Sequence, residues 1–460
     1  MKFVTTIAYI LLTILTAFSQ GEDINWIFGV ECGVTFEDIN NPAPFKSTAD
    51  NWELSASISS FSGNLEFFYS SGAFYNASNI ILQNGDSINT RETFARGMII
   101  IPFSEEIRKY HVFYIGGSIN NTALYHAVVD MVANQGNGLV LEKNDKIGET
   151  HLNEGISAVI HANGRDWWLL AHEKGVHNNC TNKFVKYLIK NESITGPIFQ
   201  EIGTSACYDP YPGGSVKFSN DGNKVVFTGY NRNRIIDIYD FDRCTGELSN
   251  FRVVDRLINP YSAEFSPNGR YLYATDFSQE YDSSNALYQY NLISPELYIP
   301  KVRLADLSNF HGDMQIGPDK KIYISLDKYP NSSLSVINRP DSAMCDFRIF
   351  SLSLDSDCFT ISGLPNMPNY TLEKKYCETG IDTPNETTIR IHPNPANESL
   401  TVEGLRYTSL FQLFDLAGKE VLREKLALDN SMIDIKDLSS GIYIYTMCGG
   451  TKIGKIVIMK

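Results

Sequence analysis

The chain has 460 residues, of which 43% are hydrophobic and 12% aromatic, and its formal net charge is −14. This length allows two or three domains, and the hydrophobic content is enough to build a full core. Nucleic-acid backbones bind clustered Lys and Arg, so an acidic chain excludes nucleic acid as a partner. The 25 Tyr and 26 Phe favour strands.

The N-terminus has the pattern of a removable signal peptide. Lys2 is followed by an apolar run at 3–18, and the small residue Ser19 ends it. A short charged start, an apolar stretch and a small-residue cleavage site predict that residues 1–19 are removed during export. No other stretch approaches the roughly 18 apolar residues of a transmembrane helix, so we expect no membrane span.

A hairpin pattern recurs through the middle of the chain. A strand of small residues leads to a tight turn, and an apolar strand follows; the turns lie at Gly63, Gly164, Gly222, Gly269 and Lys320. A further unit at 101–114 divides the long interval between the first two turns, so the period is about 50 residues. Such a period, with several short strands per unit, is typical of β-propellers.

Six units of this kind are visible, and outer strands complete them. The outer strands expected are 235–239, 286–290 and 333–337. We expect a seventh blade assembled from both ends of the region, with residues 363–366 joining the strands at 26–28 and 34–36, because a shared blade removes open sheet edges. The sequence therefore predicts an all-β fold with a seven-bladed β-propeller over residues 20–378, and a six-bladed one as the alternative.

Acidic and His residues stand just before the innermost strands of several repeats. Glu53 and Glu154 each lie ten residues before the turn glycine of their repeat, and His311 with Asp313 occupies the matching place in a later repeat. In a propeller these positions converge at the mouth of the central channel, where loops on a rigid scaffold bind ligands. We take these four as candidate ligand-binding residues. The alternative is that they only satisfy neighbouring backbone amides.

Motifs for catalysis and metal binding are missing from the sequence. The two His of residues 172–177 are five apart, whereas a metalloprotease helix needs them four apart. There is no Gly-x-Ser-x-Gly elbow, Walker-type loop or calcium loop. We therefore name no catalytic residue, no metal ligand and no cofactor.

The eight Cys are expected to form disulfides in an exported chain, although sequence alone leaves the connectivity open. Our candidate pair is Cys180 and Cys207. We expect Cys180 in a loop between the second and third strands of one blade, and Cys207 in the connection that leaves this blade on the same face.

The C-terminal region is predicted to be a separate small domain. Residues 379–388 are polar and lack periodicity, as expected of a linker. Beyond them, the strands expected are 399–402, 411–414, 420–422, 442–447 and 453–459. The turn Ala417–Gly418 suits a hairpin between two of these strands. We predict a small immunoglobulin-like β-sandwich over residues 389–460.

Three ordered blocks in this domain resemble the C-terminal sorting domain of type IX secretion system cargo. They contain Pro393, Asn394 and Pro395, then Gly418 and Lys419, then Gly441 and Tyr443. The resemblance implies that the type IX machinery recognises this domain and that the chain passes through the periplasm to the outer-membrane surface or the exterior.

Residues 24–372 also resemble a recurrent propeller family, WD40-like or TolB-like, found before such sorting domains. The matching pieces are 26–29, 63–69, 163–168 and 363–370. This resemblance implies a surface or secreted propeller and carries no established reaction.

Together these patterns predict a secreted or cell-surface propeller that acts as a non-enzymatic protein- or glycan-binding module. Two alternatives stay open: an extracellular hydrolase or lyase with its site at the channel mouth, and a structural or motility-associated envelope component. A perturbed acid pair at the mouth would favour the enzyme. An exposed aromatic patch on that face would favour binding.

Overall fold

In the computed structural model the chain divides into two compact units between Cys377 and Glu378, and each is described by itself. The structure describes residues 21–104, 106–118, 121–148, 151–176, 179–207, 213–277, 285–294, 299–308, 310–327, 332–375, 377, 390–403, 409–415, 419–426, 431–447 and 452–460. The predicted signal peptide 1–19, the predicted linker 379–388 and Gly418 lie outside these residues.

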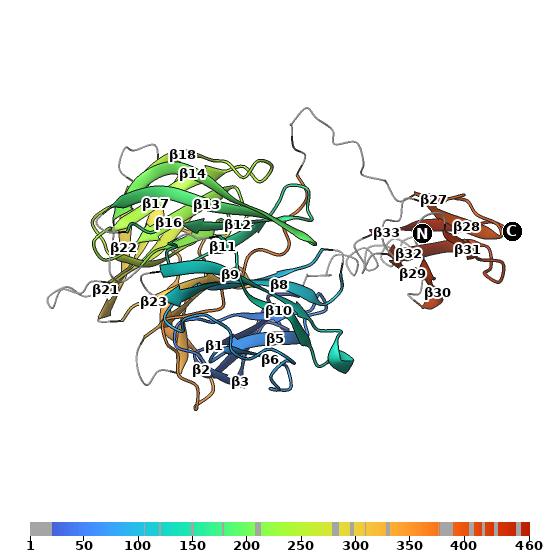
Figure 1. Cartoon of the computed structure of the whole chain (residues 1–460), viewed down its shortest axis with the longest axis horizontal. Helices are drawn as coiled ribbons and strands as arrows, with labels where there is room; N and C mark the ends of the chain where they lie inside the picture. Colours follow the sequence, from blue (N-terminus) through green and yellow to red (C-terminus); the bar gives the residue numbers. More distant parts are fainter. Residues whose placement is uncertain are drawn as a thin grey trace, which may run out of the picture. The chain divides into compact units, whose positions relative to one another are not determined.

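Unit 1 consists of antiparallel sheets that follow one another along the chain (Figure 1). The three-stranded sheets are β1 (Asn25–Phe28), β2 (Val30–Thr35) and β3 (Ala43–Asp50), then β4 (Ser57–Ser59), β5 (Leu65–Ser70) and β6 (Ala73–Asn76). The four-stranded sheets are β7 (Met98–Pro102), β8 (Lys109–Ser118), β9 (Asn121–Asp130) and β10 (Leu139–Lys146); β11 (Ser157–Ile160), β12 (Trp167–His172), β13 (Cys180–Lys190) and β14 (Ser193–Cys207); β15 (Ser215–Phe218), β16 (Lys224–Gly229), β17 (Ile235–Phe241) and β18 (Leu248–Asp255); β19 (Pro260–Phe265), β20 (Tyr271–Asp276), β21 (Asn285–Asn291) and β22 (Lys301–Ser308); β23 (Gly312–Ile316), β24 (Ile322–Leu326), β25 (Ser333–Ile337) and β26 (Phe347–Ser353). A short 3-10 turn, η1 (Asn134–Gly136), precedes β10.

The repeated turn joins the first two strands of successive sheets. Gly63, Gly164, Gly222 and Gly269 all adopt positive φ there, between 69° and 85°. Lys320 takes the same place with φ 63°. Glycine adopts this left-handed conformation without steric cost, which explains why four of these five turns carry it.

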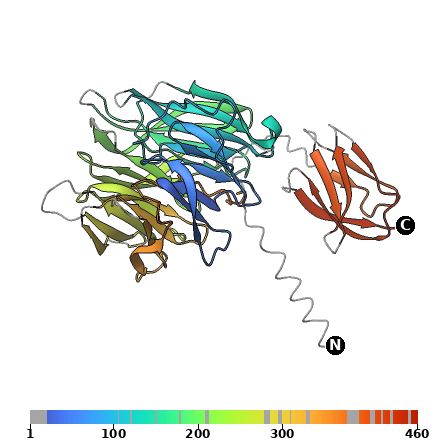
Figure 2. The same cartoon turned by 90° about the horizontal axis from the view of Figure 1, so that it is seen from below.

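The sheets pack side by side around a common centre, and aromatic rings fill the space between neighbours. Phe67 of β5 meets Tyr110 of β8 at a ring-centroid distance of 5.4 Å. Trp26 of β1 meets Tyr323 of β24 at 5.6 Å, so the first and last sheets are neighbours. Figure 2 shows this closure, with the first sheet in blue beside the last in orange. The result is an all-β, propeller-like unit.

The expectation that residues 363–366 add a strand to the first sheet is wrong. They form no strand. The C-terminal contribution is instead a two-way backbone bridge between Val30 and Phe359, with both N···O distances 3.0 Å, and a disulfide between Cys32 and Cys358.

Residues 359–375, here called the central segment, leave the first sheet and run through the centre of unit 1. The Asn366 side chain donates to the carbonyls of Arg96 and Ile156, which precede β7 and β11, at 3.1 and 2.8 Å. The Asn369 side chain donates to the carbonyl of Asn220, in the turn after β15, at 2.7 Å. Because its polar groups bond to several sheets in turn, this segment cannot pair along one strand, which explains the wrong prediction.

Unit 2 contains two sheets that share one hydrophobic core. One sheet holds β27 (Arg390–His392), β28 (Ser399–Glu403) and β31 (Ser431–Asp434), and the other holds β29 (Ser409–Phe414), β30 (Glu420–Leu426), β32 (Gly441–Met447) and β33 (Lys452–Ile458). Leu400, Leu413 and Ile456 are buried in this core. Strands lie at all five places where the sequence predicted them.

Candidate functional site

The first strands of the sheets in unit 1 run along its centre in the same direction. They begin at one end of the centre, which we call the entry end. They reach the repeated turns at the opposite end, which we call the exit end. His311 directly precedes β23, and Glu53 and Glu154 lie in the segments that lead into β4 and β11, so all three lie at the entry end. Asp313 is the second residue of β23 and lies deeper.

Glu53 and Glu154 form a neighbouring pair of acids at the entry end. Glu154 is only 7% exposed, and Glu53 is partly buried. Burial, together with the repulsion from Asp327, raises the pKa of Glu53 to about 7. Burial and the nearby Glu53 raise the pKa of Glu154 well above its ordinary range. Ser362 of the central segment donates to Glu53 Oε1 at 3.5 Å.

Aromatic rings line the same end. Tyr261 lies 4.6 Å from the His311 ring and 6.0 Å from the Tyr230 ring, and Phe277 lies 4.2 Å from His311, all between centroids. Tyr230 also forms a hydrogen bond with Glu154. The buried Tyr261 hydroxyl lies near Ser362 but makes no hydrogen bond of normal length to a described residue. Burial lowers the pKa of His311, which favours its neutral form.

Asp313 is engaged in a buried ion pair. Its Oδ1 accepts from Arg96 Nε at 2.7 Å and from Ser262 Oγ at 2.8 Å, and both charged residues are at most 2% exposed. Its Oδ2 is buried and has no partner among the described residues. The structure therefore brings Glu53, Glu154 and His311 together and places Asp313 beneath them.

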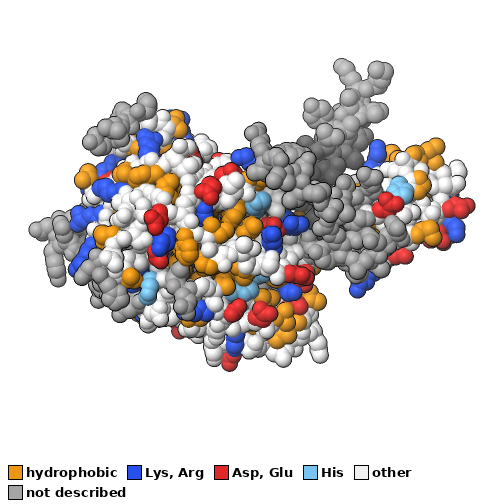
Figure 3. All heavy atoms as spheres, turned by 45° about the horizontal axis from the view of Figure 1, so that its top comes forward, with side chains coloured by type: hydrophobic (Ala, Val, Ile, Leu, Met, Phe, Trp, Pro, Cys, Tyr) orange, Lys and Arg blue, Asp and Glu red, His pale blue; other side chains and the backbone are white. Residues whose placement is uncertain are grey.

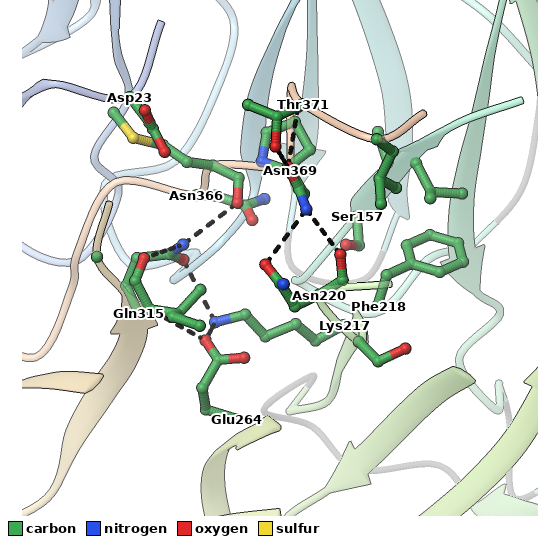
Figure 4. Close-up of a pocket in the computed structure, with 18 of the residues that line it drawn as sticks. Asp23, Ser157, Lys217, Phe218, Asn220, Glu264, Gln315, Asn366, Asn369 and Thr371 are labelled. Atoms are coloured by element: carbon green, nitrogen blue, oxygen red, sulfur yellow. Dashed lines mark hydrogen bonds and ion pairs between the residues drawn. The ribbon is translucent and has the colours of Figure 1, made fainter. Parts of the chain in front are cut away.

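A second buried ion pair lies nearer the exit end. Lys217 of β15 pairs with Glu264 of β19, and Lys217 Nζ also donates to the Met314 carbonyl at 2.8 Å. Burial lowers the pKa of Lys217, and the nearby Arg96 adds to this. Figure 4 shows Lys217, Glu264 and Gln315 facing the central segment across a cavity of about 90 Å³.

These central residues are not among those predicted from the sequence, although the sequence contains a signal for them. Lys217, Glu264 and Gln315 each occupy the next-to-last position of the first strand in successive repeats. A long polar side chain at this crowded position, with opposite charges in adjacent repeats, indicates a buried ion pair between neighbouring strands.

A wider hollow of about 400 Å³ lies beside the entry end. Residues of the connection from β12 to β13 and the first residues of β13 line it. His151, Glu173 and Lys183 line it. The imidazole Nδ1 of His151 is buried without a partner among the described residues. Glu173 and Lys183 form an ion pair at 3.0 Å.

Cys180 borders this hollow, and a disulfide joins it to Cys207. They form a cross-strand pair at the start of β13 and the end of β14. The expectation that they lie in loops is therefore wrong, because both strands continue further than their hydrophobic pattern indicates. Sequence reasoning did not find the other pairs, Cys32–Cys358 and Cys244–Cys377.

The surface of unit 1 carries exposed apolar side chains between charged ones (Figure 3). Trp52 is 62% exposed and adjoins Glu53, and Leu257 is 78% exposed on the connection into β19. Exposed large apolar side chains near a recessed polar site are typical of interaction surfaces.

In the described part of the chain, no group of three or more His, Cys, Asp and Glu is arranged to hold a metal ion. No helix there has both the length and the apolar character required to cross a membrane.

The predicted sorting residues have structural roles in unit 2. The Asn394 side chain, between Pro393 and Pro395, donates to the Lys455 carbonyl and accepts from Val457 N, both at 2.8 Å. Gly441 begins β32, and the Tyr443 hydroxyl donates to the Ser439 carbonyl at 2.9 Å. Lys419 directly precedes β30, and its backbone N donates to Asp415 Oδ1 at 3.0 Å.

Comparison with known proteins identifies unit 2. Residues 390–459 match the family described as "Secretion system C-terminal sorting domain". No curated protein matches the sequence. Among solved structures, PorZ of Porphyromonas gingivalis, a surface component of the type IX secretion system, is 11% identical over 95% of this chain and 69% of its own, with a TM-score of 0.29.

Two further solved structures are similar. A putative 6-phosphogluconolactonase from Bacteroides uniformis is 11% identical over 75% of this chain and 98% of its own, with a TM-score of 0.43. TolB from Acinetobacter baumannii is 12% identical over 68% and 65%, with a TM-score of 0.36. We draw no functional conclusion from scores this low. Residues 390–459 are a secretion-system C-terminal sorting domain, and the chain is type IX cargo exported to the cell surface or the exterior.

Proposed function

We propose that unit 1 is a seven-bladed β-propeller whose entry end binds a protein or glycan partner outside the cell, and that unit 2 is an immunoglobulin-like sandwich that serves export. The sheet β1–β3 is the seventh blade, and the central segment occupies the place of its innermost strand. The function is binding and not catalysis.

The observation that carries this proposal is the combination of groups at the entry end. Partly buried rings of Tyr261, Phe277 and His311 pack against one another, and Tyr261 lies near the acids Glu53 and Glu154. Ligand sites in proteins combine apolar and aromatic walls with a few convergent polar groups. Exposed Trp52 adjoins Glu53 in the chain, and exposed Leu257 lies on the connection into β19. Central residues of binding surfaces are enriched in such aromatic side chains.

A binding screen tests the proposal. The full secreted protein is applied to glycan and peptide arrays, and each hit is measured again with Glu154→Gln and with the control Glu142→Gln. Glu142 is exposed on β10, away from the entry end. We expect Glu154→Gln to weaken binding and Glu142→Gln to leave it unchanged. Hits that respond equally to both variants would contradict an entry-end site.

A hydrolase or lyase is the second candidate, and the raised carboxyl pKa values favour it. A carboxyl group with a pKa of about 7, such as Glu53, retains its proton near neutral pH and can act as a general acid. Its neighbour would then act as the base or nucleophile, as in glycoside hydrolysis.

Product analysis separates the two candidates. Each array hit is incubated with the protein and examined for cleavage by mass spectrometry. Binding without turnover supports the binding module. Turnover that both Glu53→Gln and Glu154→Gln abolish would establish the enzyme instead.

A further inference from the structure

The centre of unit 1 contains more acidic than basic groups. Arg96 pairs with Asp313 and Lys217 pairs with Glu264, so both central cations are engaged. Glu53 and Glu154 have no ion pair with any described Lys, Arg or His. A buried carboxylate without a cationic partner loses hydration that nothing replaces.

A second observation, independent of the acid pair, points to a missing partner. Asp313 is 1% exposed, and its Oδ2 is buried without a hydrogen bond to any described residue. The Asp313 backbone N donates to the Ser362 carbonyl at 2.9 Å, and the Ser362 hydroxyl donates to Glu53, so Asp313 lies next to the acid pair. Buried polar atoms are nearly always hydrogen-bonded, so such an atom needs a donor from elsewhere.

The surrounding rings suit a positively charged donor. Aromatic faces attract ammonium groups within about 6 Å of the ring centre, and the attraction grows when water is excluded. Tyr261 lies near Glu53 and Glu154, Phe277 packs against Tyr261 with 6.1 Å between ring centroids, and Tyr230 forms a hydrogen bond with Glu154. A neutral polyol would satisfy the acceptors but would leave the carboxylate charge unbalanced.

We propose that the partner bound at the entry end presents an alkylammonium group, such as a lysine side chain, which inserts between the rings and pairs with Glu154 and Glu53. This inference rests on the proposed binding function and names the chemical class of the ligand. The ammonium donates to the two carboxylates, and the rings enclose its methylene groups. An amino sugar carries the same group, so the test includes both sources.

Proton release is a consequence of this arrangement. The pKa of about 7 keeps Glu53 largely protonated below that pH in the free protein, and burial also raises the pKa of Glu154. An ammonium ion favours the ionised carboxylates, so binding below that pH releases protons to the buffer. Affinity for the lysine probe should therefore rise as the pH rises through about 7, because the lysine ammonium keeps its own proton over this range.

Isothermal titration calorimetry of the full mature chain tests the proposal with defined probes. Nα-acetyl-lysine methylamide is compared with its Nε-acetylated neutral form, and glucosamine with glucose, in two buffers of different ionisation enthalpy. We expect an amine to bind with buffer-dependent heat at pH 6 and its neutral counterpart to bind at least about tenfold more weakly. Preference for lysine or for glucosamine identifies the source.

Matched variants locate the effect. Glu154→Gln and Glu53→Gln should each weaken amine binding at least about tenfold and reduce proton release, whereas Glu142→Gln should change neither. Thermal melting establishes whether each variant is folded. If Glu154→Gln is not folded, amine binding by Glu53→Gln decides whether the proposal holds. Equal binding of charged and neutral probes, no amine binding, or unchanged binding by a folded variant overturns the proposal. If an array ligand still binds in an entry-end-dependent manner, only the ammonium inference fails.

Discussion

The substitution Glu53→Gln should change how the stability of unit 1 depends on pH. Glutamine keeps the shape of the side chain and an acceptor for the Ser362 hydroxyl, but it does not titrate. Folding raises the pKa of Glu53 from 4.5 to about 7, so the folded state binds this proton more tightly than the unfolded state. Its contribution to stability is therefore complete below about pH 4.5 and is lost as the pH rises to about 7.

The magnitude follows from the shift in pKa. Each pKa unit is equivalent to about 1.4 kcal/mol, so the titration of Glu53 alone should cost the wild type about 3 kcal/mol relative to the variant between about pH 4.5 and pH 7. Glu154 adds to the difference, because removing the Glu53 charge reduces the repulsion that raises its pKa.

Urea denaturation with the disulfides intact measures this difference. Wild type, Glu53→Gln and the exposed control Glu142→Gln are unfolded at several pH values between about 4.5 and 7.5, and the free energies are compared at each. The control should follow the wild type. The reasoning is refuted if the difference between wild type and Glu53→Gln stays constant, or if the wild type gains stability relative to the variant as the pH rises.

Three further predictions follow. Arg96→Met should lower the free energy of unfolding by about 3–5 kcal/mol, because it leaves Asp313 buried and unpaired. In urea denaturation, the double variant Arg96→Met with Asp313→Leu should lose less free energy of unfolding than the two single variants together. Cys358→Ser should lower the free energy of unfolding by about 2–5 kcal/mol, because it removes the disulfide to Cys32. An unchanged denaturation midpoint would contradict this. Deleting residues 390–460 should retain the chain in the cell with unit 1 folded; cell fractionation and melting curves check this, and efficient secretion would contradict it.

Local patterns were enough to predict much of the fold. The strand–turn–strand repeats around Gly222 and Gly269 appear in the structure at β15–β16 and β19–β20. Alternating apolar residues and a turn glycine act over a few positions, so each hairpin is encoded where it forms. The same holds for the sorting blocks in unit 2. The spacing of Glu53 and Glu154 from their turns predicted that both lie just ahead of an inner strand, and β4 and β11 begin a few residues after them.

The partners of buried groups depended on the tertiary structure. Arg96 and Asp313 are 217 residues apart, and Cys32 and Cys358 are 326 apart. Nothing in either local sequence indicates which distant repeat will face it across the centre. The path of the central segment is a further example, because Asn366 bonds to carbonyls of two different sheets.

The sequence by itself thus determined the strands, the repeated turns, the destination of the chain and the residues that begin the inner strands. The tertiary structure decided how these residues act on one another. The sheets close around the central segment and exclude water. This burial raises the pKa of Glu53 to about 7, and the same closure brings Arg96 and Asp313 together as an ion pair. Hydration and charge pairing depend on this enclosure, and enclosure is a property of the assembled ring of sheets and not of any single strand.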